Sequence, residues 1–230
     1  MDRVKWFLLC WLLVSYPLTA NSVIISPTVL TLNTQSHRVA QLVVTNNSTQ
    51  RLPLEALVMN LVFQDDGNYK TQVASDSPLK IFPPAAILAP GSKQTFRVQW
   101  LTDSSLDESK SYFVRFAQLQ LAKNNYDPVN QSGISSGVSV QVNYNALIHV
   151  YNSAQEPGVL LIVDDDGQGI LKNKGTRFTY SSLLHFNGIA AETQEAVLST
   201  IGDIFIPPNS SRDIIVGRLL PAGEYHGQER

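Results

Sequence analysis

The longest strand-like stretch of the chain covers residues 138–151 and reads VSVQVNYNALIHVY. Apolar and polar residues alternate along its first half, which is the pattern of a half-buried β-strand. Residues 94–101 (QTFRVQWL) and 111–121 (SYFVRFAQLQL) alternate in the same way. These three stretches predict a fold that is built mainly from β-strands.

Shorter strand-like runs fill most of the chain on either side of these stretches. They cover residues 22–32, 38–46, 54–63, 79–88, 159–163, 170–172, 178–186, 204–206 and 213–219. Turn-forming residues separate them, for example Asp65-Asp66-Gly67-Asn68, and Pro27 breaks the first run, which suits an edge strand. Long helical periodicity is absent. Many short strands with turns between them are typical of β-sandwiches, so we predict an all-β fold.

Two breaks in this pattern suggest how the chain is organised. Residues 123–137 are polar and predict a surface loop before the longest strand, and residues 152–158, with Pro157, predict a domain boundary. We therefore expect two sandwich domains, at residues 21–152 and 153–230. Residues 227–230 show no closing strand, which leaves open whether the second domain is complete.

The first twenty residues have the composition of a secretory signal peptide. Arg3 and Lys5 precede an apolar run, and Leu18-Thr19-Ala20 supplies small residues for cleavage. The apolar run is too short to span a bilayer. Cleavage after Ala20 also removes Cys10, the one cysteine, so the exported chain has no disulfide and no cysteine-based metal site.

Composition and motifs exclude several functions. The formal net charge of -2 gives no basic surplus for a nucleic-acid partner, and no segment after the leader is apolar enough to embed in a membrane. No two of the four histidines have zinc-ligand spacing, and no phosphate-binding loop or nucleophile motif occurs. We expect no enzyme activity, no cofactor and no metal, although a Ser/His/Asp triad need not be contiguous in sequence.

Three sequence motifs follow one another within residues 88–144. They are Leu88-Ala89-Pro90-Gly91 followed by Arg97-Val98, then Tyr112-Phe113-Val114-Arg115-Phe116, then the alternating residues 138–144. In this order they resemble the periplasmic chaperones of the chaperone–usher pilus pathway, and more closely its alternative branch of colonisation-factor and common pili. The resemblance covers most of residues 21–152 and is weaker in the second domain. It implies two immunoglobulin-like domains set at an angle.

The resemblance also implies a mechanism. Such a chaperone binds and folds pilin subunits that lack a strand, by lending its own strand, and delivers them to an outer-membrane usher without nucleotide. The lent strand corresponds here to residues 136–144, with Val138, Val140, Val142 and Tyr144 on one face. The residues alone leave a second interpretation open, in which these side chains pack in the protein's own core.

The family anchors the carboxylate of the subunit's C-terminus in a basic cleft. The arginine and lysine of its better-studied branch align with Val29 and Ile148 here, so neither cation is present. Arg115 is our main candidate for the anchor because its guanidinium binds a carboxylate through two hydrogen bonds. His149 is a second candidate, at the end of the lent strand.

A periplasmic, non-enzymatic chaperone is therefore the leading hypothesis. The alternative from another class is an exported immunoglobulin-like pilus subunit or adhesin that uses its strands for its own assembly. A subunit is expected to be a single incomplete sandwich, whereas this sequence predicts two domains and a polar loop before Val138. An exported β-sandwich hydrolase is a more distant alternative.

Overall fold

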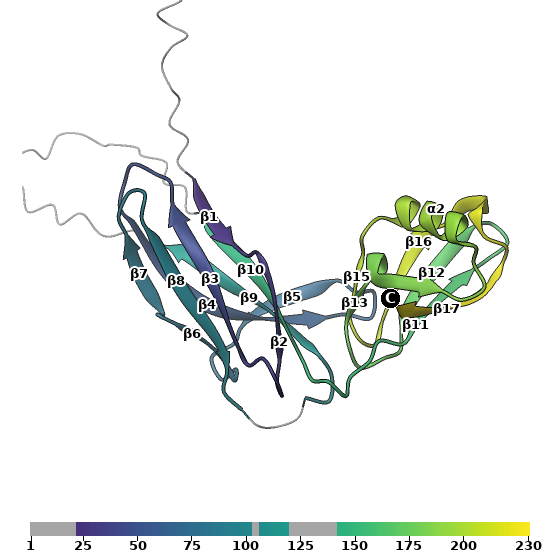
Figure 1. Ribbon diagram of the computed structural model, residues 1–230, viewed down its shortest axis with the longest axis horizontal. Coiled ribbons are helices and arrows are strands. Elements are labelled where there is room, and N and C mark those ends of the chain that lie inside the picture. Colours follow the sequence, from purple (N-terminus) through teal and green to yellow (C-terminus); the bar gives the residue numbers. More distant parts are fainter. Residues whose placement is uncertain (1–21, 103–105, 120–141) are drawn as a thin grey trace, which may run out of the picture.

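The computed structural model describes residues 22–102, 106–119 and 142–230. Two β-rich domains meet at an angle, with the first domain formed by strands between Val23 and Tyr151 (Figure 1). Among the described residues, no helix has the length and apolar character needed to cross a membrane.

Two sheets form the first domain. One has the strand order β1-β3-β8-β6, and the other has the order β2-β10-β9-β4-β5, with β7 also paired to β4. The strands of the first sheet are β1 (Val23–Ser26), β3 (Val39–Asn46), β8 (Lys93–Trp100) and β6 (Leu79–Phe82). Those of the second are β2 (Val29–Asn33), β10 (Asn143–Tyr151), β9 (Lys110–Gln118), β4 (Leu52–Phe63), β5 (Tyr69–Val73) and β7 (Ala85–Leu88).

Alternating apolar residues from both sheets fill the space between them. Phe96 on β8 packs edge-to-face on Phe116 of β9 with ring centroids 4.8 Å apart, and both side chains are fully buried. Trp100, Leu32 and Ile148 belong to the same core. This interdigitation of two inner faces is what holds a β-sandwich together.

Prolines mark two of the places where the chain crosses from one sheet to the other. Pro27 lies between β1, which pairs with β3, and β2, which pairs with β10. Pro83 and Pro84 lie between β6, which pairs with β8, and β7, which pairs with β4. Because proline lacks the backbone N–H that a ladder needs, a strand ends there, as the sequence predicts for Pro27.

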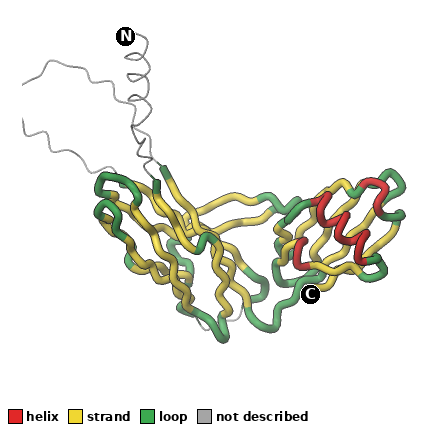
Figure 2. The backbone as a smooth tube through the Cα atoms, turned by 45° about the horizontal axis from the view of Figure 1, so that its top comes forward, coloured by secondary structure: helices red, strands yellow, loops and turns green. Residues whose placement is uncertain are grey.

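The second domain is a five-stranded sheet covered on one face by a helix and a small sheet (Figures 1 and 2). Its strand order is β14-β17-β11-β12-β16, and β13 pairs with β15. The strands are β11 (Val159–Val163), β12 (Gln168–Asn173), β13 (Thr179–Tyr180), β14 (Leu184–Phe186), β15 (Phe205–Ile206), β16 (Ser210–Ile215) and β17 (Gly223–Glu229). The helices are α2 (Ala191–Ile201) and the one-turn 3-10 helices η1 (Ser181–Leu183) and η2 (Gly217–Leu219).

One element of this domain was not predicted, and two expectations for it are wrong. The fold is β-rich as predicted, but α2 is a helix of 11 residues whose Val197 is fully buried against the sheet. Residues 178–186 form two short strands around a 3-10 turn instead of one strand. A closing strand is present, because β17 lies between β11 and β14. The sequence GEYHGQE of β17 has few strand formers, so pairing on both edges stabilises it instead.

Candidate functional site

Strand β10 has two parts with different neighbours. From Leu147 to Tyr151 it lies between β9 and the parallel strand β2, whereas from Asn143 to Ala146 it pairs with β9 alone among the described residues. The boundary is marked by a hydrogen bond in which the Leu147 backbone N–H donates to the Thr28 carbonyl oxygen at 2.8 Å. The beginning of β10 therefore presents an open edge to which a further strand can be added.

The predicted strand-lending residues are only partly within the described chain. Val138 and Val140, like the polar loop expected at residues 123–137, lie outside the described residues. Val142 precedes β10 and is 39% exposed, and Tyr144 is half-buried against the core of the first domain. Both line a cleft of about 220 Å³ at the end of the sandwich, beside Val23 and Leu52.

Side chains at alternate positions of the second sheet point away from the core and form its outer face. By register these are Val29, Thr31 and Asn33 on β2; Asn143, Asn145, Leu147, His149 and Tyr151 on β10; Ser111, Phe113, Arg115 and Ala117 on β9; Glu55, Leu57, Met59, Leu61 and Phe63 on β4; and Tyr69, Thr71 and Val73 on β5. Most of them are apolar, and Val29 is 48% exposed.

Arg115 is the one cation among these outer-face residues. It lies between Leu57 of β4 and Asn145 of β10 in the register, and Phe113 precedes it on the same face. Among the described residues its guanidinium makes one hydrogen bond, from Nε to Asn145 Oδ1 at 3.4 Å. A guanidinium on an apolar face that keeps most of its donors free is suited to binding a carboxylate.

His149 lies at the other end of the outer face, where the two domains touch. Its imidazole is 0% exposed and is stacked between Phe178 and Phe205 of the second domain, at ring-centroid distances of 4.2 and 5.0 Å. Its Nδ1 is 2.8 Å from Ser111 Oγ and its Nε2 is 2.9 Å from Tyr180 Oη. In this arrangement neither ring nitrogen is available to an incoming carboxylate.

Burial also keeps His149 uncharged. Desolvation lowers the pKa of the imidazole from 6.5 to about 4, because a buried cation is costly. Burial, together with the nearby carboxylate of Asp203, raises the pKa of the Tyr180 hydroxyl. At neutral pH both groups are therefore neutral, and they join the domains through a hydrogen bond and not through an ion pair.

Backbone groups add a second set of contacts between the domains. The β4–β5 hairpin reaches the second domain (Figure 1), where the Ser211 N–H donates to the Asp65 carbonyl at 2.7 Å and Arg212 Nη2 donates to the Gly67 carbonyl at 2.9 Å. The Phe178 N–H donates to Ser109 Oγ at 2.9 Å. The first two bonds fix the hairpin to β16, and all three join the two domains.

Comparisons with solved structures were made over the whole chain. A class 5 fimbriae chaperone, CfaA, aligns with a TM-score of 0.54 at 15% identity, over 88% of this chain and 84% of that chain. A chain of the CsuC–CsuE chaperone–tip subunit complex, from the archaic chaperone–usher Csu pili of Acinetobacter baumannii, aligns with a TM-score of 0.53 at 15% identity, over 84% and 89%. The chain has the fold of the chaperone–usher pilus chaperones.

A third pilus-chaperone structure agrees with this. A chain in the complex of the SafA pilin with the SafB chaperone from Salmonella enterica has a TM-score of 0.52 at 13% identity, over 91% of this chain and 97% of that chain. No protein-family model matches the sequence, and no curated protein matches it either.

Within the pilus-chaperone fold, one sequence alignment needs correction. The family's second basic position was aligned with Ile148, but Ile148 is fully buried in the core of the first domain. The outward-facing neighbour of Val29 is Leu147, which is its register partner in β2–β10. Because successive residues of a strand face opposite sides, an error of one residue moves a side chain from the cleft to the core.

The aromatic contacts between the domains are the feature that sequence reasoning missed. Phe178, Tyr180 and Phe205 come from short elements of the second domain, and Phe63 of β4 adds to them with its ring centroid 5.5 Å from Phe205. In the sequence these aromatic residues stand out only by their spacing near short strands. That spacing does not indicate which residues they contact. Among the described residues, no group of His, Cys, Asp and Glu could hold a metal ion.

Proposed function

We propose that this protein is a periplasmic chaperone that binds pilin subunits by lending them a strand and delivers them to an outer-membrane usher. The observation that carries the proposal is the open edge of β10 at residues 143–146, in a chain with the pilus-chaperone fold. Solved structures with this fold include complexes of a chaperone with a pilin or a tip subunit.

The lent strand begins before β10 and continues into it. The valines at positions 138, 140 and 142 have the same parity as Tyr144 and Ala146, which face the core of the first domain. A strand that continues with this parity presents its valines to the groove of the subunit. Each valine that becomes fully buried contributes about 1.5 kcal/mol before the cost of ordering the strand.

Arg115 is the anchor that sets the register of the lent strand. It projects from the outer face beside Asn145, which is in the open part of β10. A subunit whose last strand lies along this edge brings its C-terminal carboxylate to the guanidinium. A bound subunit would cover the guanidinium and its apolar neighbours Phe113 and Leu57, and charge-assisted hydrogen bonds become stronger once water is displaced.

The protein acts by binding and not by catalysis, and its leader directs export and is cleaved after Ala20. The two-domain arrangement favours a chaperone over a pilus subunit, since a subunit of this kind is a single sandwich that lacks a strand. The angled domains of the present protein place the outer face of the first domain beside the second domain (Figure 2).

Co-expression with a pilin tests this function. The chain is produced with the small exported β-proteins encoded beside it, one of them tagged, and co-purification is measured for the wild type and for Val140→Asp. We expect the charge in the groove to abolish recovery of the subunit while the chaperone stays soluble. The matched control is Gln141→Asp, which places the same charge on the opposite face of the strand.

Two results would contradict the proposal. If none of the exported β-proteins co-purifies with the wild type, the chain is not their chaperone. If Val140→Asp and Gln141→Asp reduce recovery equally, the side chain at position 140 does not enter a groove.

A further inference from the structure

The second domain has a sheet edge of its own at β16, where the β4–β5 hairpin covers Ser211 and, among the described residues, leaves Asp213 and Ile215 open. This strand pairs with β12 on one side and has no strand on the other among the described residues. The Ser211 N–H points outward, because it donates to the Asp65 carbonyl of the β4–β5 hairpin. By the alternation of an antiparallel ladder, the N–H and C=O groups of Asp213 and Ile215 point outward as well.

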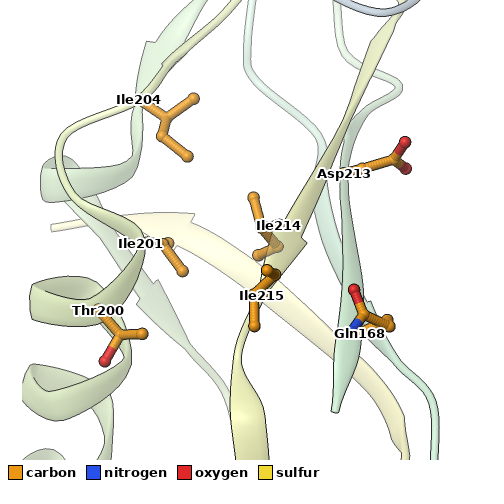
Figure 3. Close-up of a pocket in the computed structure, with 7 residues that line it drawn as sticks. All are labelled: Gln168, Thr200, Ile201, Ile204, Asp213, Ile214 and Ile215. Atoms are coloured by element: carbon orange, nitrogen blue, oxygen red, sulfur yellow. The ribbon is translucent and has the colours of Figure 1, made fainter. Parts of the chain in front are cut away.

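A groove of about 550 Å³ runs along this edge on the side of α2 (Figure 3). Thr200 and Ile201 of the helix lie on one side of it and Ile214 of β16 on the other, with Ile204 at one end. On the opposite face of the sheet, a second groove of about 310 Å³ is lined by residues that include Ile162 and Ile170. A strand added to β16 would therefore place alternate side chains into an aliphatic groove on one face and toward a groove that includes Asp164 and Asp213 on the other.

The charged residues that line the two grooves indicate the charge of a partner segment that would fit them. Asp213 lines both grooves and Asp164 lines the second, and the residues that line either groove include no lysine or arginine. Arg212, next to Asp213 in the chain, is directed to the β4–β5 hairpin, where its Nη2 donates to the Gly67 carbonyl. The other nearby cations lie at the two ends: Lys172 opposite Ser211 in the register, and Arg218 in η2. Between them, the exposed carboxylate of Asp213 is beside Ile215, which is 66% exposed.

We propose that the free edge of β16 is a docking site for an extended segment of another protein that carries aliphatic side chains at alternate positions and lysine or arginine between them. The segment adds to the sheet as a sixth strand: its aliphatic side chains enter the groove beside Ile201 and its cations meet Asp213. This site does not depend on the proposed function, because it lies on the other domain from the β10 edge.

A second copy of the chain fits this edge less well. In a pairing of β16 with itself, the open residues are Asp213 and Ile215, so the two Asp213 carboxylates become direct or diagonal neighbours. Like charges at such positions are destabilising in a sheet. A basic segment removes that repulsion and neutralises the carboxylate.

Binding of a short synthetic peptide tests the site. The probe is the end-blocked, fluorescein-labelled peptide Thr-Val-Lys-Val-Lys-Val-Thr, and anisotropy is measured against the whole exported chain. We expect saturable binding below about 1 mM, the range of a weak peptide contact. The same peptide with glutamate in place of lysine should bind at least about fivefold more weakly, because it loses a surface ion pair.

Charge exchange makes the test specific to this edge. Asp213→Lys should reverse the preference, so that the glutamate peptide binds more tightly than the lysine peptide. The matched control is Asp107→Lys, which introduces the same charge at an exposed position of the first domain and should leave the preference unchanged. A peptide with proline in place of the central valine should not bind, since it lacks an N–H for the ladder, and it tests edge pairing without altering the protein.

Three results would overturn the proposal. One is that the lysine peptide does not bind at all. Another is that Asp213→Lys leaves the preference as it is in the wild type. The third is that light scattering detects a dimer of the wild type that Ile215→Lys dissociates and Ile87→Lys does not. In that case a second copy occupies the edge. Ile87 is 64% exposed and serves as the control.

Discussion

The imidazole of His149 lies nearly parallel to the ring of Phe205, with an interplanar angle of 17° and centroids 5.0 Å apart, although the two residues belong to different domains. Phe178 covers the other face of the imidazole at 4.2 Å. The first domain thus inserts a neutral, hydrogen-bonded side chain between two aromatic rings of the second. The domain angle therefore depends on packing and on the protonation of one group.

This junction predicts that stability falls in mild acid. His149 binds a proton near pH 4 when folded and near pH 6.5 when unfolded, so between these values the unfolded state holds more protons. Its contribution to the free energy of unfolding is complete above pH 6.5 and is lost as the pH falls toward 4. The loss approaches about 3 kcal/mol. Urea unfolding at a series of pH values measures it.

The variant His149→Gln isolates this effect from other titrations. It keeps a donor and an acceptor for Ser111 and Tyr180 but does not titrate. The loss of stability between pH 6.5 and 4 should therefore be smaller than in the wild type by about 3 kcal/mol. His185→Gln, at an exposed position, should keep the wild-type dependence. An equal pH dependence in all three proteins would contradict the assignment to His149.

Removal of the aromatic contact should loosen the angle between the domains. Phe205→Ala removes contacts with four rings, those of Phe63, His149, Phe178 and Tyr180, and should lower the free energy of unfolding by about 2–3 kcal/mol. Spin labels on cysteines at Thr95 and Lys172 report the separation of the domains.

We expect the distance distribution between those labels to broaden in Phe205→Ala. Phe82→Ala is the control, because Phe82 is an exposed aromatic residue of the first domain that no ring of the second domain contacts. A distribution as narrow as that of the wild type would mean that the backbone contacts alone, such as Ser211 with Asp65, hold the angle.

Arg115→Ala should weaken the binding of a pilin subunit by about tenfold or more, the effect of losing charge-assisted hydrogen bonds to a carboxylate. Affinity is measured by titration with a purified subunit and with the same subunit lacking its C-terminal residues. The difference between wild type and variant should disappear with the shortened subunit. Arg97→Ala, on the exposed side of β8, is the control for a general loss of positive charge.

An interior amide should be essential to the second domain. Asn173 is fully buried, its Oδ1 accepts the N–H groups of Gly158 and Gly175 at 3.0 and 2.9 Å, and its Nδ2 donates to the carbonyl of Arg177 at 2.8 Å. Asn173→Leu leaves these backbone groups without partners and should cost about 3 kcal/mol or more. Thermal unfolding measures the loss, and Asn187→Leu, at an exposed position, should cost little.

The strands that could be predicted from the sequence are those whose side chains alternate between core and surface. Residues 38–46 were expected to form a strand and β3 covers Val39–Asn46, with Leu42 and Val44 fully buried. Helix α2 was missed because its sequence AETQEAVLSTI buries few residues, chiefly Gln194 and Val197, so its apolar pattern is short. Strand β17 was missed because its own residues have few strand formers, and its pairing with β11 and β14 stabilises it instead.

The candidate site was predictable only in part. The residue types of the lent strand and Arg115 stand out in the sequence, and their roles stay predictions. The burial of His149 and the inward orientation of Ile148 follow from the register of β10 with β2 and β9, which places these two residues beside partners distant in sequence, such as Ser111 and Tyr112. A single sequence does not specify such a register, because a shift of one residue preserves the local pattern but exchanges the faces.

The position of Pro27 has a consequence for the length of strand on offer. Where the first segment leaves one sheet and joins the other as β2, it begins to pair with β10 at Leu147, and the described part of β10 before Leu147 pairs with β9 alone. Moving this proline two residues earlier would lengthen β2, and two further residues of β10 would then be paired with it. The crossover at Pro27 thus fixes how many residues of β10 stay unpaired on that side and, under the proposed function, how long a strand can be lent to a subunit.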